Sequence, residues 1–156
     1  MSAGERDASG FPAEPELRVA RFVARCRELG LKLTQQRLEI YKALVTEPGH
    51  PSAEVIYTSL LPAMPTLSLD TVYRTLVTLE RNGLIGRVEV LDDHARFDAN
   101  LEPHHHLVCR RCRTALDFVW PALDRLEAPK GTEGWGRVDS RHLELRGLCR
   151  RCLDQE

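Results

Sequence analysis

Apolar residues in the first half of the chain recur at the spacing of helices. Between residues 16 and 29 they fall three or four positions apart, which places them on one face of a helix. Three later segments repeat this spacing, and each begins with a residue type that caps helices: Thr34, Ser52 or Ser68. We predict helices over residues 16–29, 34–45, 53–61 and 69–82.

Strand-like alternation follows the last of these helices. Valine alternates with glutamate over residues 88–90, two aspartates at 92 and 93 predict a turn, and residues 95–97 alternate again. This pattern predicts a short β-hairpin. Short helices followed by a hairpin are the layout of a winged helix-turn-helix, in which the last helix before the hairpin enters the major groove of DNA.

The second half of the chain has shorter elements. We expect strands over residues 106–109, 115–118 and 138–148, and a short helix over 121–126. A unit of roughly 50 residues buries little apolar surface, so it should depend on a metal, a partner subunit or both. The predicted fold class is α+β, a winged helix-turn-helix domain followed by a small α/β domain.

Composition narrows the class of protein. The chain has 156 residues, of which 42% are hydrophobic and 29% are charged, as in ordinary globular proteins. No run approaches the roughly 18 apolar residues that cross a bilayer, and the N-terminus lacks the pattern of a signal peptide. We therefore expect a cytoplasmic protein without a membrane partner, in which thiols stay reduced.

Charge is informative only locally, because the net charge is −1. Between Leu17 and Lys42 the chain carries seven arginines and lysines against two glutamates. Such a segment is either a solvated helix face or a surface for phosphates.

Four of the five cysteines form two pairs with the spacing of metal ligands. Cys109 and Cys112 are separated by two residues, as are Cys149 and Cys152, and 36 residues lie between the pairs. One such pair could be a redox centre, but two of them, without a thioredoxin-like βαβ unit, predict a closed tetrahedral Zn2+ site whose role is folding. The fifth cysteine, Cys26, lies on an apolar helix face and is predicted to be core.

A second group of metal-ligand side chains lies outside the cysteine pairs. On a strand, His104 and His106 point to one face and can give two imidazoles to one metal. Histidine with aspartate favours Fe2+, Mn2+ or Zn2+, and the absence of a thiolate weighs against Zn2+. The alternative is that these are polar loop residues. The candidates are His50, Asp98, His104, His105, His106 and Asp117.

These motifs, in this order, resemble the ferric uptake regulator family of metal-dependent bacterial repressors. The resemblance runs from about Leu31 to Cys152. It is carried by LTQQRLEIYKAL, HPSAEVIY, LSLDTVYRTLVTLERNGLI, RFDAN, HHHLVCRRC and GLCRRC.

The resemblance implies a homodimer that binds double-stranded operator DNA through its winged helix. It implies a winged-helix domain, here over residues 16–93, a hinge over 94–102 and a dimerisation and metal-binding domain over 103–156. Residues 1–15 are rich in Gly, Ala, Ser and Glu and hold two prolines, a composition that predicts a mobile tail. The resemblance also implies a regulatory Fe2+ or Mn2+ site in which one ion joins both domains. The ligands implied for that ion are His50, Asp98, His104, His106 and Asp117.

The two aspartates separate the branches of the family. Asp98 and Asp117 are typical of the peroxide-sensing branch, in which bound Fe2+ reacts with peroxide and a ligand histidine is oxidised, here His50 or His104. The motif TVYRTL resembles iron regulators instead, so iron sensing stays the alternative. A further family site is poorly matched, because Pro103 and Arg141 replace histidines and His142 is displaced by one position. That leaves His105, Asp124 and His142 without an assigned site.

The DNA contacts are expected on and around the helix over residues 69–82. Tyr73 and Arg74 are the candidates for base edges, since arginine suits bidentate contact with guanine. Candidates for phosphate contacts are Thr71, Arg37, Gln36, Arg18 and Arg21.

Two other functions compete with a metal-dependent repressor. A zinc hydrolase could activate water at a site of histidine and aspartate ligands, but no separate general base is evident. A winged-helix protein whose second unit only dimerises would bind DNA regardless of Fe2+ or Mn2+. We expect a repressor and not an enzyme.

Overall fold

The computed structural model describes residues 14–88 and 94–155, and the chain divides into two compact units, Met1–Leu101 and Glu102–Glu156. We call these unit 1 and unit 2 and describe each by itself. The predicted hinge, residues 94–102, falls across this division. None of the helices within the described residues is long and apolar enough to cross a membrane.

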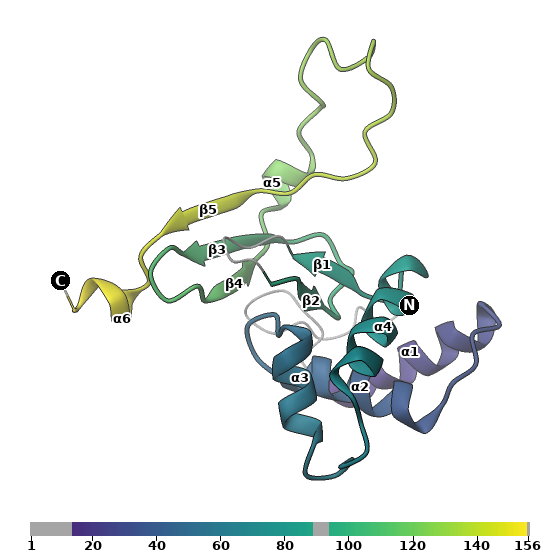
Figure 1. The fold of residues 1–156 in the computed structure, drawn as a ribbon. Helices are drawn as coiled ribbons and strands as arrows, with labels where there is room; N and C mark the ends of the chain where they lie inside the picture. The colour runs from purple at the N-terminus through teal and green to yellow at the C-terminus, as the bar shows by residue number, and fades with distance from the viewer. Residues whose placement is uncertain (1–13, 89–93, 156) are drawn as a thin grey trace. The chain divides into compact units, whose positions relative to one another are not determined.

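Unit 1 is a helical body with a two-stranded antiparallel sheet. Three of its helices begin where the sequence predicted: Thr34, Ser52 and Ser68 each accept a hydrogen bond from the backbone N–H three residues on, at 3.1, 3.4 and 3.1 Å. Its elements are α1 (Pro15–Glu28), α2 (Gln35–Thr46), α3 (Ala53–Leu60), α4 (Leu69–Arg81), β1 (Gly86–Val88) and β2 (Arg96–Asp98) (Figure 1).

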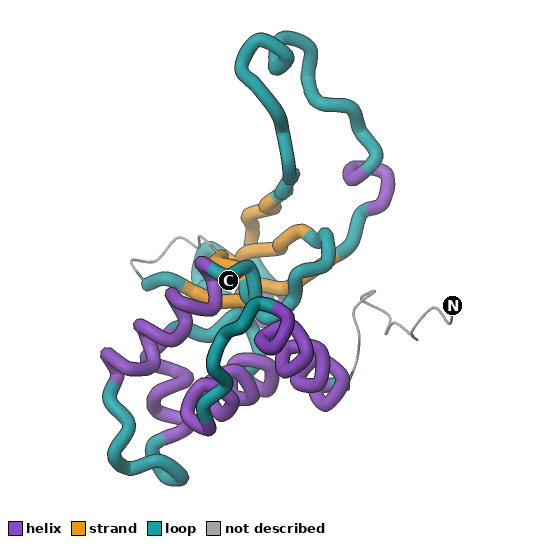
Figure 2. Tube along the Cα trace, turned by 90° about the vertical axis from the view of Figure 1, so that its right-hand side faces the viewer, coloured by secondary structure: helices purple, strands orange, loops and turns teal. Residues whose placement is uncertain are grey.

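The core of unit 1 joins the helices to the sheet. Apolar residues from α2, α3 and α4 are fully buried between the helices, whose arrangement Figure 2 shows. Phe97 on β2 is fully buried in the same cluster. Because side chains alternate along a strand, burying Phe97 fixes where its neighbours Arg96 and Asp98 point. The deepest residues of this cluster are Cys26, Ile40, Ile56, Val72, Leu76, Leu79 and Phe97.

Unit 2 is built on a three-stranded sheet in the order β4-β3-β5. β3 pairs antiparallel with β4 and parallel with β5, so the segment between β4 and β5 must cross from one edge of the sheet to the other. The elements of unit 2 are β3 (His105–Cys109), β4 (Ala115–Phe118), α5 (Pro121–Asp124), β5 (Glu144–Gly147) and α6 (Arg150–Leu153).

The connection between α5 and β5 differs from the sequence-based expectation. The strand predicted over residues 138–148 is confirmed only for Glu144–Gly147, and the helix predicted over 121–126 ends at Asp124. Among the described strands β5 pairs with β3 alone, which begins at His105, and Pro103, two residues before that start, has no N–H to extend the strand. Residues 125–143 therefore form a long loop, visible in Figures 1 and 2.

One short helix was not predicted, and two predicted segments fall outside the described residues. The helix α6 was not predicted, since four residues are too few to show helical periodicity. The turn predicted at residues 92 and 93, and most of the predicted tail, lie outside the described residues. The fold class itself is confirmed, with helices and hairpin in unit 1 and a mixed α/β unit 2.

Candidate functional site

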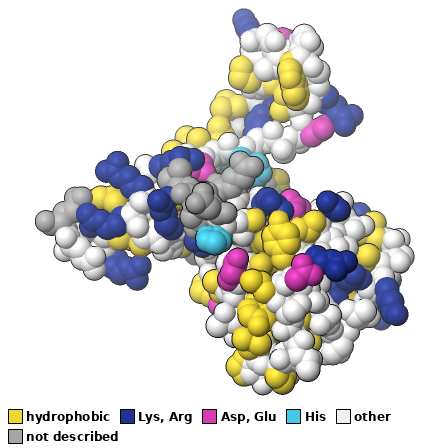
Figure 3. All heavy atoms as spheres, in the orientation of Figure 1, with side chains coloured by type: hydrophobic (Ala, Val, Ile, Leu, Met, Phe, Trp, Pro, Cys, Tyr) yellow, Lys and Arg dark blue, Asp and Glu magenta, His cyan; other side chains and the backbone are white. Residues whose placement is uncertain are grey.

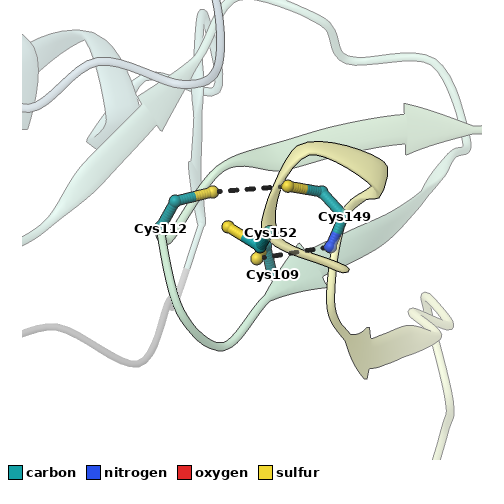
Figure 4. Close-up of side chains that lie close together, drawn as sticks. All are labelled: Cys109, Cys112, Cys149 and Cys152. Atoms are coloured by element: carbon teal, nitrogen blue, oxygen red, sulfur yellow. Dashed lines mark hydrogen bonds between the residues drawn. The ribbon is translucent and has the colours of Figure 1, made fainter. Parts of the chain in front are cut away.

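The four paired cysteines come together at one end of unit 2. Cys109 ends β3, Cys149 precedes α6, and their partners Cys112 and Cys152 lie three residues further on. One sulfur from each lies within 4.8 Å of the other three, and none of the four forms a disulfide. The close-up in Figure 4 shows the four side chains converging from two separate turns of the chain.

Groups around the sulfurs stabilise the thiolate form. The N–H of Cys149 donates to Cys109 Sγ at 3.4 Å, and the hydroxyl of Thr114 lies 3.2 Å from Cys112 Sγ (Figure 4 draws the first). Backbone N–H groups of Cys112 and Cys149 lower the pKa of Cys109. The Thr114 hydroxyl and N–H lower the pKa of Cys112 to about 5. Thiolates are the form that binds metal, so the site is prepared for a cation.

The thiol of Cys152 also indicates that the cluster needs a cation. Burial, together with the neighbouring sulfurs, raises the pKa of Cys152 to about 12. Four thiolates cannot be held this close without a cation among them, and Zn2+ satisfies four sulfurs in a closed tetrahedral site. The cluster therefore fits a structural Zn2+ and leaves no ligand position for a substrate.

Arginines surround this cluster. Arg111 Nη1 donates to the carbonyl of Cys152 at 2.6 Å, and the pKa of Arg151 is raised by its hydrogen bond to the Cys112 thiolate. The side chains of Arg110 and Arg150 are exposed. Figure 3 shows dark blue side chains gathered over this end of unit 2. Positive charge beside a tetrathiolate offsets its negative charge.

Unit 1 contributes a histidine and an aspartate from two different elements. His50 Nδ1 lies 3.7 Å from Asp98 Oδ2, and both side chains are buried. The N–H of Asn100 donates to Asp98 Oδ1 at 2.7 Å, which holds the carboxylate in place. Buried carboxylates are costly unless a positive group or hydrogen bonds compensate them, so a cation here would be stabilising.

Backbone contacts between a loop and β2 bring these two residues together. Pro51 accepts a hydrogen bond from Phe97 N at 3.1 Å, and Ser52 forms an isolated bridge with Arg96. His50 itself has a φ of 58°, in the left-handed region that non-glycine residues avoid. Strained backbone persists where the surrounding structure holds it, as the contacts of Pro51 and Ser52 with β2 do here.

Unit 2 contributes a second cluster of donors on the sheet. His104 Nε2 lies 3.0 Å from His106 Nε2, and Asp117 Oδ1 lies 3.9 and 3.4 Å from these two atoms. The register explains the third member, since His106 pairs directly with Asp117 on β4. Two imidazoles and one carboxylate converge on one point.

The tautomer of His104 suits metal binding. His104 Nδ1 lies 2.7 Å from the carbonyl oxygen of Glu102, which can only accept, so Nδ1 carries the proton. Nε2 is then left with its lone pair directed at His106 and Asp117. A backbone carbonyl that fixes the far nitrogen of an imidazole is the usual support of a ligand histidine. This donor set of nitrogen and oxygen fits Fe2+ or Mn2+.

His105 points to the opposite face of the sheet. Its Nε2 lies 3.3 Å from Asp124 Oδ1, its Nδ1 accepts from Leu143 N at 3.2 Å, and it is fully buried beside Phe118. These contacts give His105 a structural role between β3, β5 and α5. Arg141 Nη1 donates to the carbonyl of Asp124 at 3.1 Å, so it anchors the loop instead of supplying a ligand.

The residues expected to read bases lie on the exposed side of α4. Tyr73 is 44% exposed and Arg74 is exposed, with Nη1 of Arg74 3.7 Å from Asp70 Oδ2. Thr71 Oγ1 bonds instead to the cap residue Ser68, at 2.8 Å.

The side chains expected to contact phosphates differ in their exposure to solvent. Arg21 is exposed, whereas Arg18, Gln36 and Arg37 are half-buried. Arg37 Nη1 donates to the carbonyl of Lys32, so this guanidinium holds the turn between α1 and α2.

Sequence reasoning missed one pair that positions this surface. Arg87 on β1 donates to both carboxylate oxygens of Glu80 on α4, at 3.0 and 2.9 Å, which ties the hairpin to the helix. Its guanidinium also lies 5.5 Å from the centre of the Phe97 ring. Opposite charges seven residues apart across a turn give no periodic signal, so this contact emerges only from the fold.

Comparison with known proteins identifies the family. A model of the ferric uptake regulator family matches residues 28–145, which is more than half of the chain. The chain belongs to this family. It is therefore a metal-dependent transcription regulator and not an enzyme.

Curated relatives share most of the chain. The peroxide-responsive repressor PerR of Staphylococcus epidermidis is 31% identical over 133 residues, covering 85% of this chain and 89% of the relative. The protein of the same name from Staphylococcus aureus is also 31% identical over 133 residues, covering 85% of this chain and 90% of the relative.

Solved structures share the fold. The Pseudomonas aeruginosa ferric uptake regulator with manganese is 30% identical, with a TM-score of 0.64, covering 82% of this chain and 97% of that one. The Helicobacter pylori regulator Fur has a TM-score of 0.69 at 24% identity, covering 98% of this chain and 97% of that one. The second likeness supports the fold alone.

Proposed function

We propose that this protein is a cytoplasmic, homodimeric repressor whose binding to operator DNA depends on one divalent ion held jointly by both units. His50 and Asp98 would supply the ligands from unit 1, and His104, His106 and Asp117 those from unit 2. The ion supplies charge that holds these five side chains together. Joining the units would fix how α4 is presented to DNA, an allosteric coupling that is typically worth about 1–3 kcal/mol.

One observation carries this proposal: each unit presents an incomplete group of metal donors. Unit 1 offers one imidazole and one carboxylate, and unit 2 offers two imidazoles and one carboxylate. Neither group contains a thiolate, so Fe2+ and Mn2+ suit the combined set. The Pseudomonas aeruginosa regulator with manganese is consistent with such an ion.

We propose further that the repressor senses peroxide. The aspartates at 98 and 117 and the likeness to peroxide-responsive repressors support this branch of the family. In the oxidised protein one oxygen atom of peroxide would be added to the imidazole of His50 or His104, and water would be released. Either change removes a neutral nitrogen donor, so the ligand set loosens and the repressor leaves DNA. Plain iron sensing is the alternative, in which peroxide has no effect on DNA binding.

The dimer is supported by an exposed apolar row on the sheet of unit 2. Leu107 pairs with Leu116 on β4 and with Leu145 on β5, so the three side chains share one face. They are 44%, 57% and 45% exposed. A unit of this size gains stability by covering such a face, and a second copy of the chain would do so.

The deciding experiment is a titration of operator DNA at fixed salt. The zinc-loaded protein is tested without further metal, with Fe2+ or Mn2+, and with Fe2+ after exposure to peroxide. We expect tight binding only with metal, and its loss after peroxide, together with a gain in mass of one oxygen atom at a histidine. Binding that ignores Fe2+ and Mn2+ would contradict regulation by metal. Metal dependence without a peroxide effect would establish the iron-sensing alternative.

A further inference from the structure

His142 lies just before β5, on the face of the unit 2 sheet that carries His104 and His106. In the parallel register, His106 is level with Glu144, so His104 is level with His142 when the register is extended by two residues. Residues two apart along a strand point to the same face, which places His142 with His104 and His106. The next residue faces the other way, since Leu143 N donates to His105 Nδ1 at 3.2 Å.

Ring geometry confirms this placement. The centre of the His142 ring lies 6.2 Å from the ring centres of both His104 and His106. It is nearly parallel to the ring of His106, at 7°, and nearly perpendicular to that of His104, at 84°. Three imidazoles and the carboxylate of Asp117 therefore share one small area. The side chain of His142 is exposed, so its rotamer can change at little cost.

We propose that His142 is a further ligand of the ion held by His104, His106 and Asp117. This inference rests on the function proposed above, because it concerns the same ion. It gives unit 2 four donors of its own, three imidazole nitrogens and one carboxylate. Unit 2 can then bind a divalent ion before His50 and Asp98 engage it.

His142 lies one position after the histidine of the further family site, which Arg141 replaces here. This displacement explains why no sequence pattern assigns His142 to a metal site. A one-residue shift on a strand moves a side chain to the other face of the sheet. Here the shift takes the imidazole away from His105 and Asp124 and places it beside His104 and His106.

The test is a titration of the full-length, zinc-loaded protein with Co2+, followed by visible absorption. Co2+ reports both affinity and the ligand set, so a merely structural role for His142 would leave its spectrum unchanged. We expect His142→Ala to weaken Co2+ binding by at least about tenfold and to change the spectrum. His94→Ala is the matched control, because His94 is an exposed histidine of unit 1 beside Glu54.

Two more variants separate this inference from the function on which it rests. His106→Ala should lose the Co2+ site, whereas His50→Ala should retain binding that His50→Ala/His142→Ala loses. If His106→Ala loses the site and His142→Ala matches the unsubstituted protein in affinity and spectrum, the role of His142 is overturned and the proposed function stands. If His106→Ala also binds Co2+ normally, the proposed site itself is wrong. Zinc content of each variant shows that unit 2 has remained folded.

Discussion

The sulfur atoms of Cys112 and Cys149 lie 3.7 Å apart, although 36 residues separate the two cysteines in the sequence. The segment between them contains β4, α5, the long loop and β5. The cysteine cluster therefore closes nearly the whole of unit 2. A metal that binds only the folded unit contributes its binding free energy to folding, and this is large for structural Zn2+, on the order of 10 kcal/mol.

We accordingly expect Cys109→Ser to unfold unit 2 and to release the tightly held zinc. Circular dichroism and zinc content measured on the same sample check this. Cys26→Ser is the matched control, since Cys26 is fully buried in unit 1 and lies outside the cluster. That control should keep its zinc. A folded Cys109→Ser protein that still carries zinc would contradict a structural role for the cluster.

Alkylation should divide the five cysteines into two classes. Burial raises the pKa of Cys26, which keeps that thiol protonated and unreactive. The other four should be protected by metal. A chelator should therefore make these four thiols reactive to iodoacetamide, whereas Cys26 should react only after denaturant is added. Mass spectrometry after each step counts the labelled cysteines. Labelling of Cys26 together with the other four would show that unit 1 does not shield it.

The sequence predicted best those features that depend on neighbouring residues. Helix starts at Thr34, Ser52 and Ser68 follow from a side chain that accepts a hydrogen bond three residues on, which is a local interaction. The cysteine pairs could be recognised as metal ligands equally well, because each pair lies within one local turn. These two local signals, helix starts and cysteine pairs, explain why the fold class could be predicted correctly.

Features that depend on distant segments were not predictable. The strand expected over residues 138–148 fails in its first half because β3, its neighbour among the described strands, begins only at His105, a fact about another part of the chain. The face adopted by His142 likewise depends on the register of β5 against β3. Periodicity cannot report either.

Recognition of operator sequence should depend on Arg74. This residue lies in the exposed N-terminal half of α4, where recognition helices contact bases, and its contact with Asp70 at 3.7 Å is at the surface. Arg74→Ala should cost about 1–3 kcal/mol of discrimination between operator and unrelated DNA. Competition titrations at fixed salt measure this.

Arg81 provides the comparison for Arg74. It is exposed at the C-terminal end of the same helix, so Arg81→Ala removes the same charge away from the predicted base contacts. We expect it to weaken binding to all DNA sequences equally and to leave discrimination intact. If Arg74→Ala behaves in the same way as Arg81→Ala, the assignment of Arg74 to base readout fails.

The pair formed by Glu80 and Arg87 should couple the hairpin to α4. Two parallel hydrogen bonds at 3.0 and 2.9 Å make the pair bidentate, and they raise the pKa of Arg87. Because the pair is partly exposed, we expect a coupling of only about 0.2–1 kcal/mol in a double-mutant cycle of Glu80→Gln and Arg87→Gln. Thermal unfolding of the four proteins measures it, and the coupling should fall in high salt. Arg87→Lys keeps the charge but not the forked geometry, so it should lose most of this coupling. Additive effects of the two substitutions would mean that the pair does not tie the hairpin to the helix.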